Sequence, residues 1–245
     1  MKTFNLIDFR RTLNNLDMNY HKSDILFVHA DLTYLGQPEG GVEMIGEVLQ
    51  HHCGCVVAPT FNFTYCDTRE FYVDKSPSIL GVLSNYICKQ GRRSHHPTES
   101  VAAWGQGQVG ITKNNPACAY DEGGAFDMLY RENAKTLFLG VKDFDETMIH
   151  FAERIAGVPY RYWKLYPGRI FDNTGWHDFD CKRYVRDMDK NVQLSSVPIA
   201  EKLISHGLLE SVPLNYGLVS ICKVRDWVDI AIDMLEKDPY ALVKK

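Results

Sequence analysis

Two adjacent histidines stand in a stretch whose side chains suit chemistry better than packing. Residues 92–105 read RRSHHPTESVAAWG, which joins an arginine pair, His95, His96, three hydroxyl groups and a carboxylate to an apolar end. Because a proline disfavours helical geometry in the residue before it, Pro97 keeps His96 on an extended or turning segment. Loops on a rigid scaffold often carry catalytic groups, and imidazole acts as a general base near neutral pH. The stretch therefore predicts a catalytic histidine. The alternative is an ordinary polar loop in which one histidine has its hydrogen bonds satisfied within the protein.

A second pair of groups that could do chemistry is His150 with Glu153. If residues 148–154 form a helix, these two side chains share one face, because positions three apart are neighbours on a helix. Such a pair can act as acid and base or bind a metal, and ordinary helix polarity is the alternative. Together with His95 and His96, the pair leaves open a hydrolytic metal site. The chain has no C-x-x-C pair of the kind found in structural zinc sites.

Buried strands that enter polar loops would position these groups. Residues 25–29 are apolar apart from His29 and lead through a polar loop to Gly40 and Gly41, after which apolar residues recur at helical spacing. Free amides at such a helix start suit an anionic ligand, although this glycine pair belongs to neither a P-loop nor a G-x-G-x-x-G run. Residues 55–58 read as a second strand. Residues 59–65 follow with aromatic, hydroxyl and amide side chains that suit the lip of a pocket or an edge strand.

The remaining pattern predicts further helices and strands. Helices are expected at residues 4–16, 76–91, 198–209 and 225–235, and strands at residues 135–141 and 214–222. Residues 160–184 alternate aromatic and charged side chains, which predicts strands and turns in a hairpin region. Its Tyr and Trp side chains could line a sugar-sized site or cover a small core. We expect an α/β fold with a central mixed sheet flanked by helices and a smaller strand- and hairpin-rich region.

The length and composition of the chain limit the class of protein that it can be. The chain has 245 residues, 45% of them hydrophobic, and a formal net charge of −4. We therefore expect a single domain over residues 1–245, with an aromatic-rich insertion at about 160–190. No basic stretch suggests a nucleic-acid partner, and no apolar run is long enough to span a bilayer. The N-terminus lacks the apolar core of a signal peptide, and seven scattered cysteines fit reduced thiols, so a cytoplasmic location without membrane contact is expected. The oligomeric state stays open, a homo-oligomer included.

Four ordered segments give the chain a family resemblance. Residues 29–36 read HADLTYLG and are followed by the glycine pair, residues 57–61 read VAPTF, residues 93–105 read RSHHPTESVAAWG, and residues 139–141 read LGV ahead of Thr147, His150 and Glu153. Together they cover roughly residues 20 to 155 and resemble, in the same order, the motifs of the aminoglycoside 3-N-acetyltransferase family. Residues 124–126 read GAF where that family often has Ser-Pro-Phe.

The resemblance implies a fold distinct from the GNAT acetyltransferases. It also implies transfer of an acetyl group from acetyl-coenzyme A to an amino group of an amino sugar, without a metal. His96 would be the general base, oriented by Glu153 or, as the weaker candidate, by Asp178. Thr60 or a backbone amide would stabilise the thioester oxyanion. Coenzyme A would contact Asp31, Leu32, Thr33, Gly40, Gly41, Ser94, Ser100 and Val101. The amino sugar would contact Asn62, Tyr65, His150 and Asp178.

The charged residues near the expected site indicate which acceptor substrate it would bind. A polycationic aminoglycoside calls for an acidic pocket, and acids are present at Asp143, Asp145, Glu146 and Asp178. Cations occur close by in the sequence, at Arg161, Lys164, Arg169, Lys182 and Arg183. Because such cations suit a diphosphate, the acceptor expected is a nucleotide-linked amino sugar of polysaccharide biosynthesis. The alternatives are an aminoglycoside 3-N-acetyltransferase that confers antibiotic resistance, a metal-dependent hydrolase, and a binding protein that keeps the fold without activity.

Overall fold

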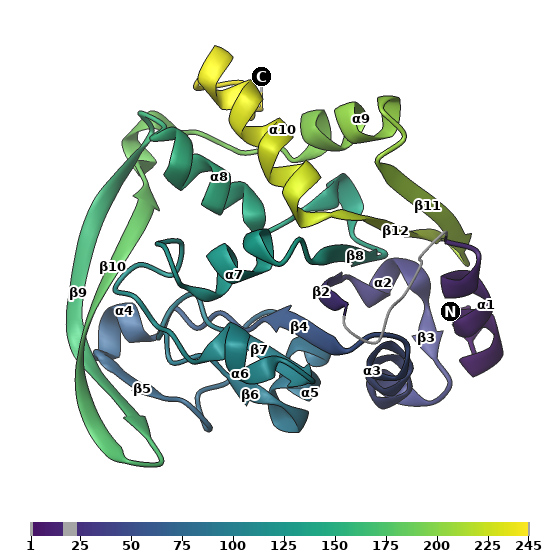
Figure 1. Cartoon of the computed structure of the whole chain (residues 1–245), viewed down its shortest axis with the longest axis horizontal. Helices are drawn as coiled ribbons and strands as arrows, with labels where there is room; N and C mark the ends of the chain where they lie inside the picture. Colours follow the sequence, from purple (N-terminus) through teal and green to yellow (C-terminus); the bar gives the residue numbers. More distant parts are fainter. Residues whose placement is uncertain (1, 17–23, 245) are drawn as a thin grey trace.

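A seven-stranded mixed sheet forms the centre of the protein (Figure 1). The structure is a computed structural model that describes residues 2–16 and 24–244. The strands follow the order β11-β12-β8-β2-β4-β7-β6. Their bounds are β2 (Ile25–Ala30), β4 (Cys55–Pro59), β6 (Arg92–Arg93), β7 (Val101–Gly105), β8 (Lys135–Leu139), β11 (Leu209–Leu214) and β12 (Gly217–Lys223). Strand β2 pairs in parallel with β4 and β8, whereas the outer pairs are antiparallel. The expected α/β fold with a central mixed sheet is confirmed.

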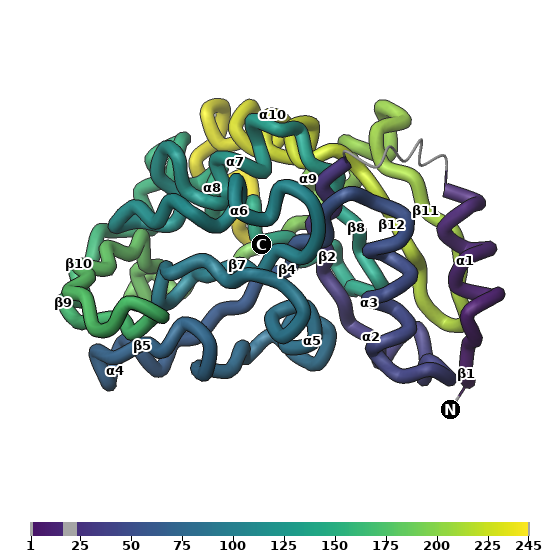
Figure 2. The backbone as a smooth tube through the Cα atoms, turned by 60° about the horizontal axis from the view of Figure 1, so that its bottom comes forward, coloured from purple at the N-terminus to yellow at the C-terminus, as the bar shows by residue number. Residues whose placement is uncertain are grey.

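Side chains of the central strands face two helical layers. Phe27 and Val57 pack with one layer, made of α7 (Ala125–Arg131), α8 (Met148–Ala156), α9 (Val197–Ser205) and α10 (Val224–Lys237). Leu26 and Val56, one residue away, pack with the other layer, made of α1 (Leu6–Asn14), α3 (Gly41–His52) and α5 (Val82–Gln90). Figure 2 shows these helices on the two sides of the sheet. Because both faces are covered, the central strands are nearly continuous apolar runs, which is the pattern that identified them in the sequence.

A long hairpin stands beside the main sheet, at the left of Figure 1. It consists of β9 (Arg161–Asp172) and β10 (Gly175–Arg186), which pair in antiparallel register, and β5 (Glu70–Tyr72) pairs in parallel with β9. A small core of its own includes Tyr65, Phe71 and Cys181. The expected hairpin region is therefore confirmed. Residues 59–65 do not form an edge strand but lead from β4 into α4 (Tyr65–Thr68) and then β5.

Short elements complete the connections. They are β1 (Thr3–Phe4), which pairs in parallel with β3 (Gln37–Pro38), the helices α2 (Leu32–Leu35) and α6 (Gln108–Thr112), and the 3-10 turns η1 (Lys142–Phe144) and η2 (Met188–Lys190). Helix α2 and turn η1 both follow central strands of the sheet, β2 and β8. Because these parallel strands end at one edge of the sheet, the polar residues that follow them are brought together there.

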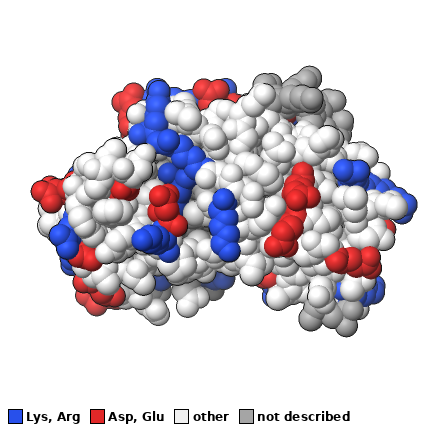
Figure 3. All heavy atoms as spheres, turned by 90° about the horizontal axis from the view of Figure 1, so that it is seen from below, with Lys and Arg blue, Asp and Glu red and all other residues white. Residues whose placement is uncertain are grey.

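Acidic and basic side chains are interspersed on the face of the protein that Figure 3 shows. Neither the acidic nor the basic side chains form one continuous patch on this face. Within the described ranges, no helix combines the length and the apolar character needed to cross a bilayer.

Candidate active site

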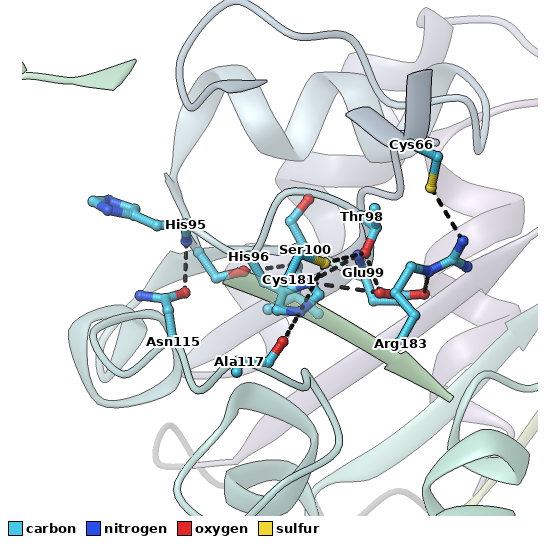
Figure 4. Close-up of polar contacts among 12 residues, drawn as sticks. Cys66, His95, His96, Thr98, Glu99, Ser100, Asn115, Ala117, Cys181 and Arg183 are labelled. Carbon is cyan, nitrogen blue, oxygen red and sulfur yellow. Dashed lines mark hydrogen bonds and ion pairs between the residues drawn. The ribbon is translucent and has the colours of Figure 1, made fainter. Parts of the chain in front are cut away.

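His96 lies inside the protein, in the turn between β6 and β7 (Figure 4). Its side chain is buried and both ring nitrogens are engaged. Nδ1 accepts a hydrogen bond from the Glu99 amide at 3.1 Å, so Nε2 carries the proton and donates to the Ala117 carbonyl at 3.2 Å. Burial lowers the pKa of His96, and the charge of Glu99 opposes this only in part. His96 is therefore held neutral, and neither nitrogen offers a free lone pair for a substrate proton.

Glu99 connects this turn to the hairpin. Its Oε1 accepts a hydrogen bond from Arg183 Nε at 2.6 Å, and Arg183 also donates to Cys66 Sγ at 3.3 Å (Figure 4). Ligand atoms of His96, Glu99 and Cys181 lie within 4.8 Å of one another, a spacing that a metal ion could use. The donor set does not suit one, because both nitrogens of His96 are engaged and Arg183 holds a cation against Glu99. Burial also raises the pKa of Cys181 to about 12, which keeps it a thiol rather than a metal-binding thiolate.

The four residues of the alternative hydrolytic metal site do not come together. Nδ1 of His95 lies 3.4 Å from Asp172 Oδ2 at the far end of β9, whereas His150 contacts Glu153 on α8. In the ranges that the structure describes, no metal-like grouping unites His95 and His96 with this pair. The geometry therefore gives the hydrolase alternative no support.

A buried arginine organises the residues that were predicted to surround the thioester. Arg93 donates from Nε to Ser100 Oγ at 3.0 Å and from its terminal nitrogens to the carbonyls of Thr60 and Ser76. Ser100 Oγ donates to the Thr60 carbonyl at 2.7 Å, so the Thr60 hydroxyl, 3.0 Å from Ser100 Oγ, must donate to that oxygen. Thr60 and Ser100 are fully buried. The hydroxyl of Thr60 thus has its proton committed inside the fold, which does not fit the oxyanion role predicted for it.

Other predicted site residues also serve the fold. Ser94 Oγ accepts a hydrogen bond from the Val101 amide at 3.0 Å, which holds β6 against β7. The Asn62 side chain donates to a loop carbonyl at 3.0 Å, and the Tyr65 hydroxyl donates to a β10 carbonyl at 2.9 Å. These four residues are buried. Asp178 lies exposed on β10, opposite a β9 arginine in the register, and lines neither of the two cavities described next.

His150 stands where two cavities meet. It lies on α8, a helix that buries Met148, Ile149 and Phe151 against the core and leaves His150 partly exposed. One cavity has a volume of about 530 Å³ and the other about 460 Å³, and His150 lines both. Its Nδ1 lies 2.8 Å from Glu153 Oε2, one helical turn away. Within the described part of the chain, no hydrogen bond engages Nε2.

Glu153 is fully buried under His150 and receives a second contact from the hairpin. Nη2 of Arg161 lies 2.8 Å from the same Oε2. Burial acts to raise the pKa of Glu153, but the hydrogen bond and charge of His150 and the charge of Arg161 outweigh it and lower that pKa. Arg161 Nη2 also lies 2.9 Å from His150 Nδ1. Because a carboxylate only accepts, an unprotonated Nδ1 would place two acceptors 2.8 Å apart, so we place the imidazole proton on Nδ1, which leaves the Nε2 lone pair free. Sequence reasoning missed Arg161 as a partner of Glu153, because no fixed spacing relates a helix to the strand after it.

Carboxylates line the larger cavity, which we call the acidic cavity. They belong to Asp31, Asp143, Asp145 and Glu146. Glu146 is buried, its Oε1 lies 3.2 Å from His29 Nε2, and its Oε2 accepts a hydrogen bond from the Met148 amide, so both of its oxygens are engaged within the fold. Burial raises the pKa of Asp145, and the neighbouring charge of Asp143 adds to the effect. The other three carboxylates are available to ammonium groups of a ligand.

Cations line the smaller cavity, which we call the basic groove. They belong to Arg161, Lys164, Arg183 and Arg186, all on the hairpin strands β9 and β10. In the sequence these cations all follow the acids at Asp143, Asp145 and Glu146. In the structure they lie on different sides of His150, because the acids follow β8 whereas the cations follow α8.

The predicted coenzyme contacts of the N-terminal half lie on the acidic side. Asp31, Leu32 and Thr33 border a space of about 290 Å³ that shares residues with the acidic cavity. The Asp31 carboxylate accepts a hydrogen bond from the Thr33 amide at 3.1 Å. Gly40 and Gly41 begin α3, and a Cβ at Gly41 would meet the Glu43 carboxylate. The helix start that was predicted to attract an anion, at Gly40 and Gly41, thus already faces a carboxylate of the chain itself, and so does the Thr33 amide.

Comparisons with known proteins agree with the geometry. Residues 27–236 match the family model described as aminoglycoside 3-N-acetyltransferase. The chain is similar to an aminoglycoside N(3)-acetyltransferase III of Salmonella sp., with 27% identity over 176 residues; the match covers 62% of this chain and 62% of that protein. The chain thus spans about 62% of the length of that curated relative.

Two solved structures share the fold. The first is AAC-IIIb in a binary complex with CoASH, with a TM-score of 0.81, 19% identity and coverage of 96% of this chain and 97% of that chain. The second is a histidine-to-alanine variant of AAC(3)-IVa in complex with apramycin, with a TM-score of 0.78, 21% identity and coverage of 98% of this chain and 96% of that chain. The expected non-GNAT acetyltransferase fold is confirmed.

These findings overturn the prediction of a nucleotide-linked sugar acceptor in polysaccharide biosynthesis and favour the alternative of an aminoglycoside acceptor. The error has a physical reason: the cations that suggested a diphosphate rim line a groove of their own, apart from the acidic cavity. The match of the family model spans most of the sequence, and the chain belongs to the aminoglycoside 3-N-acetyltransferase family.

Proposed function

We propose that this protein transfers the acetyl group of acetyl-coenzyme A to an amino group of an aminoglycoside, with His150 as the general base. The observation that carries the proposal is the His150–Glu153 pair at the junction of two cavities, with Nδ1 bonded and Nε2 free. His96, the base that the resemblance implied, is buried with both nitrogens engaged and does not suit this role.

The chemistry assigned to these residues is a single proton relay. The acceptor nitrogen attacks the carbonyl carbon of the thioester while Nε2 of His150 takes a proton from that nitrogen. The carbon–sulfur bond then breaks, and the departing thiolate receives the proton from His150. Glu153 keeps the imidazole in the required tautomer and stabilises the transient imidazolium, as the third member of a triad does.

The acidic cavity is where we place the acceptor. An aminoglycoside carries several ammonium groups, and Asp31, Asp143 and Asp145 offer carboxylates on the side of His150 that faces α2 and η1. Carboxylates gathered in a cleft raise both the affinity for a polycationic ligand and its rate of association. We also propose a cytoplasmic location, which the absence of disulfide bonds among the seven cysteines supports.

A thiol-release assay with acetyl-coenzyme A tests the proposal. Acceptors are an aminoglycoside such as apramycin, an amino sugar with one amine, and a blank without acceptor. We expect release of thiol with the aminoglycoside only, together with an acetylated product by mass spectrometry. Binding of coenzyme A without acetylation of any aminoglycoside would overturn the acceptor assignment.

A further inference from the structure

The two faces of the hairpin formed by β9 and β10 have different surroundings. Tyr166 and Cys181, which are opposite each other in the register, are buried in the small core together with Ile170. Because side chains alternate along a strand, the intervening residues point to the other face, which we call the outer face. The hairpin is the outermost layer at the left of Figures 1 and 2. Helix α8 reaches one end of the outer face, where the Arg154 guanidinium lies 5.5 Å from the centre of the Trp163 ring.

Large apolar side chains are exposed on this outer face. Trp163, Leu165 and Phe171 of β9 are 41%, 54% and 36% exposed, and Trp176, directly opposite Phe171 on β10, is 39% exposed. They extend along about 27 Å of the strand, from Trp163 to Phe171. A sheet face that is open to water normally carries polar side chains, so a row of apolar side chains in this position marks an interaction surface.

Charged side chains of both signs lie between the two aromatic ends. Arg169, Lys182, Asp178 and Asp180 belong to the outer face, because each is in register with another of its residues. Arg169 is paired with Glu70 of the neighbouring strand β5. Within the described part of the chain, Lys182, Asp178 and Asp180 form no ion pair. A partner must therefore offer apolar surface and charges of both signs, which suits a protein and does not suit the polyanionic surface of a nucleic acid.

The pattern on the outer face complements itself under half a turn. Pro167 and Asp180 are opposite each other at its middle. If a second copy is turned about an axis that crosses both strands at this pair, residues at equal distances from the middle meet face to face. Trp163 then meets Phe171 of the second copy, and Lys182 meets Asp178 of the second copy. Because the axis is two-fold, each of these contacts occurs twice.

The centre of such an arrangement carries one repulsive contact. Asp180 meets its own copy at the axis, where two like charges oppose association. Lys182 lies two residues away on the same face of β10, so both copies bring a cation close to these carboxylates. The ammonium of Lys182 lies 4.2 Å from the centre of the Trp163 ring, which holds this cation over the outer face.

We propose that the outer face of the hairpin is the interface of a two-fold homodimer, in which Lys182 of each copy pairs with Asp178 of the other. The interface takes in about ten residues of each copy, fewer than the roughly 20–30 of a standard interface, so the dimer should form reversibly as the concentration rises. Lys164 and Arg183 of the basic groove belong to the inner face of the hairpin, so dimerisation leaves that groove open.

Sedimentation velocity over a series of protein concentrations tests the inference without any substrate. The variants are Lys182→Glu and Asp178→Lys, each of which places like charges across both symmetric contacts. We expect wild type to approach the mass of two chains and each variant to dimerise at least about tenfold more weakly. Lys113→Glu, an exposed residue outside the hairpin, is the control for a charge reversal elsewhere. Thermal melting of each variant checks that the fold is retained.

Mixing the two variants is the sharper test. An equimolar mixture of Lys182→Glu and Asp178→Lys should form heterodimers about as well as wild type forms homodimers, because the charges across both contacts are again opposite in sign. Asp180→Asn should dimerise more tightly than wild type, because it removes the repulsion at the axis.

Three results would overturn the inference. A wild-type protein that stays monomeric over the whole concentration series would show that no second copy binds this face. A dimer that both charge reversals leave unchanged would place the interface elsewhere. Folded variants whose mixture stays monomeric, or an Asp180→Asn dimer weaker than wild type, would contradict the two-fold arrangement.

Discussion

His150 and Arg161 converge on one oxygen of Glu153. Nδ1 of His150 and Nη2 of Arg161 each lie 2.8 Å from Glu153 Oε2, and the carboxylate is completely buried. Helix α8 supplies the histidine and the glutamate, and the first residue of β9 supplies the arginine. The carboxylate thereby fixes the imidazole tautomer, and the arginine balances the buried charge. On the proposed function, this relationship prepares His150 rather than His96 to take a proton.

Replacing His150 by glutamine should remove the base and keep the fold. The side chain is 32% exposed, so its loss leaves no core cavity. We expect kcat to fall on the order of 10²-fold or more while Tm shifts little. The measurement is steady-state acetyl transfer together with thermal melting. A variant with unchanged kcat would show that His150 takes no proton in the reaction.

The Glu153→Gln variant should lose both activity and stability. It leaves Arg161 without a carboxylate partner, a loss that costs about 3 kcal/mol or more in buried pairs. Combining it with Arg161→Met should recover part of the stability but none of the activity, because the orienting carboxylate is still missing. Chemical denaturation and kcat for the single and double variants measure the two effects. Full activity in the double variant would contradict the orienting role.

The lowered pKa of Glu153 also sets a dependence of stability on pH. The unfolded chain binds the Glu153 proton more readily than the folded protein does, so the contribution is present above the ordinary carboxyl pKa and is lost as the pH falls through the folded-state value. Wild type should therefore lose stability in acid more steeply than Glu153→Gln. Equal slopes of the unfolding free energy against pH would refute this.

His96 should matter to the fold and to its response to mild acid. Burial lowers the pKa of His96, so the unfolded chain takes up this proton first as the pH falls below about 6.5 and the folded protein loses stability. His96→Asn keeps an acceptor near the Glu99 amide and removes the titration. We expect a cost of roughly 1–3 kcal/mol at neutral pH and a smaller drop in Tm between about pH 7.5 and 5.5 than in wild type. The same drop in both proteins would show that His96 is not held neutral by burial.

The acidic cavity should set the affinity for the acceptor. Replacing Asp143 and Asp145 by asparagine removes two carboxylates from its wall. We expect KM for an aminoglycoside to rise about tenfold, less so at high salt, with kcat nearly unchanged, because the removed charges bind ammonium groups before and during the reaction alike. Asp189→Asn, on η2 outside both cavities, is the control for the loss of a carboxylate elsewhere. Equal KM values for the three proteins would place the acceptor elsewhere.

The single-domain organisation stays a prediction, and unfolding tests it. Trp163 and Trp176 lie on the hairpin, whereas Trp104 and Trp227 lie on β7 and α10. If the hairpin and the main sheet unfold as one unit, Trp fluorescence and far-ultraviolet circular dichroism should give the same midpoint in denaturant. A variant with phenylalanine at both hairpin tryptophans should keep that midpoint for its remaining fluorescence. Separate midpoints would divide the chain into two units.

Much of the fold could be read from the sequence because its signals are local. Residues 25–30, 55–59 and 135–139 are short apolar runs of the kind that strands buried on both faces require, and they became β2, β4 and β8. The alternating aromatic and charged residues of 160–184 became the hairpin. The spacing of His150 and Glu153 predicted their contact correctly, because helix geometry fixes it.

The roles of the individual site residues could not be predicted from the sequence in the same way. The sequence shows that His96 and His150 are both imidazoles near polar groups, but it does not show which one faces a cavity. That depends on β10, whose Cys181 and Arg183 pack over the turn that carries His96. The prediction of the acceptor from the charged residues was wrong for a related reason. Lys164 follows Asp145 by only 19 residues in the sequence, yet α8 and the start of β9 separate them, and they line different cavities.

The most direct test of the account compares acetyl transfer to an aminoglycoside by wild type, His150→Gln and His96→Asn, at a pH where all three are folded. If His150 is the base, wild type and His96→Asn should turn over within a few-fold of each other, and His150→Gln should lose activity on the order of 10²-fold or more. A folded His96→Asn protein without activity, beside an active His150→Gln protein, would contradict it.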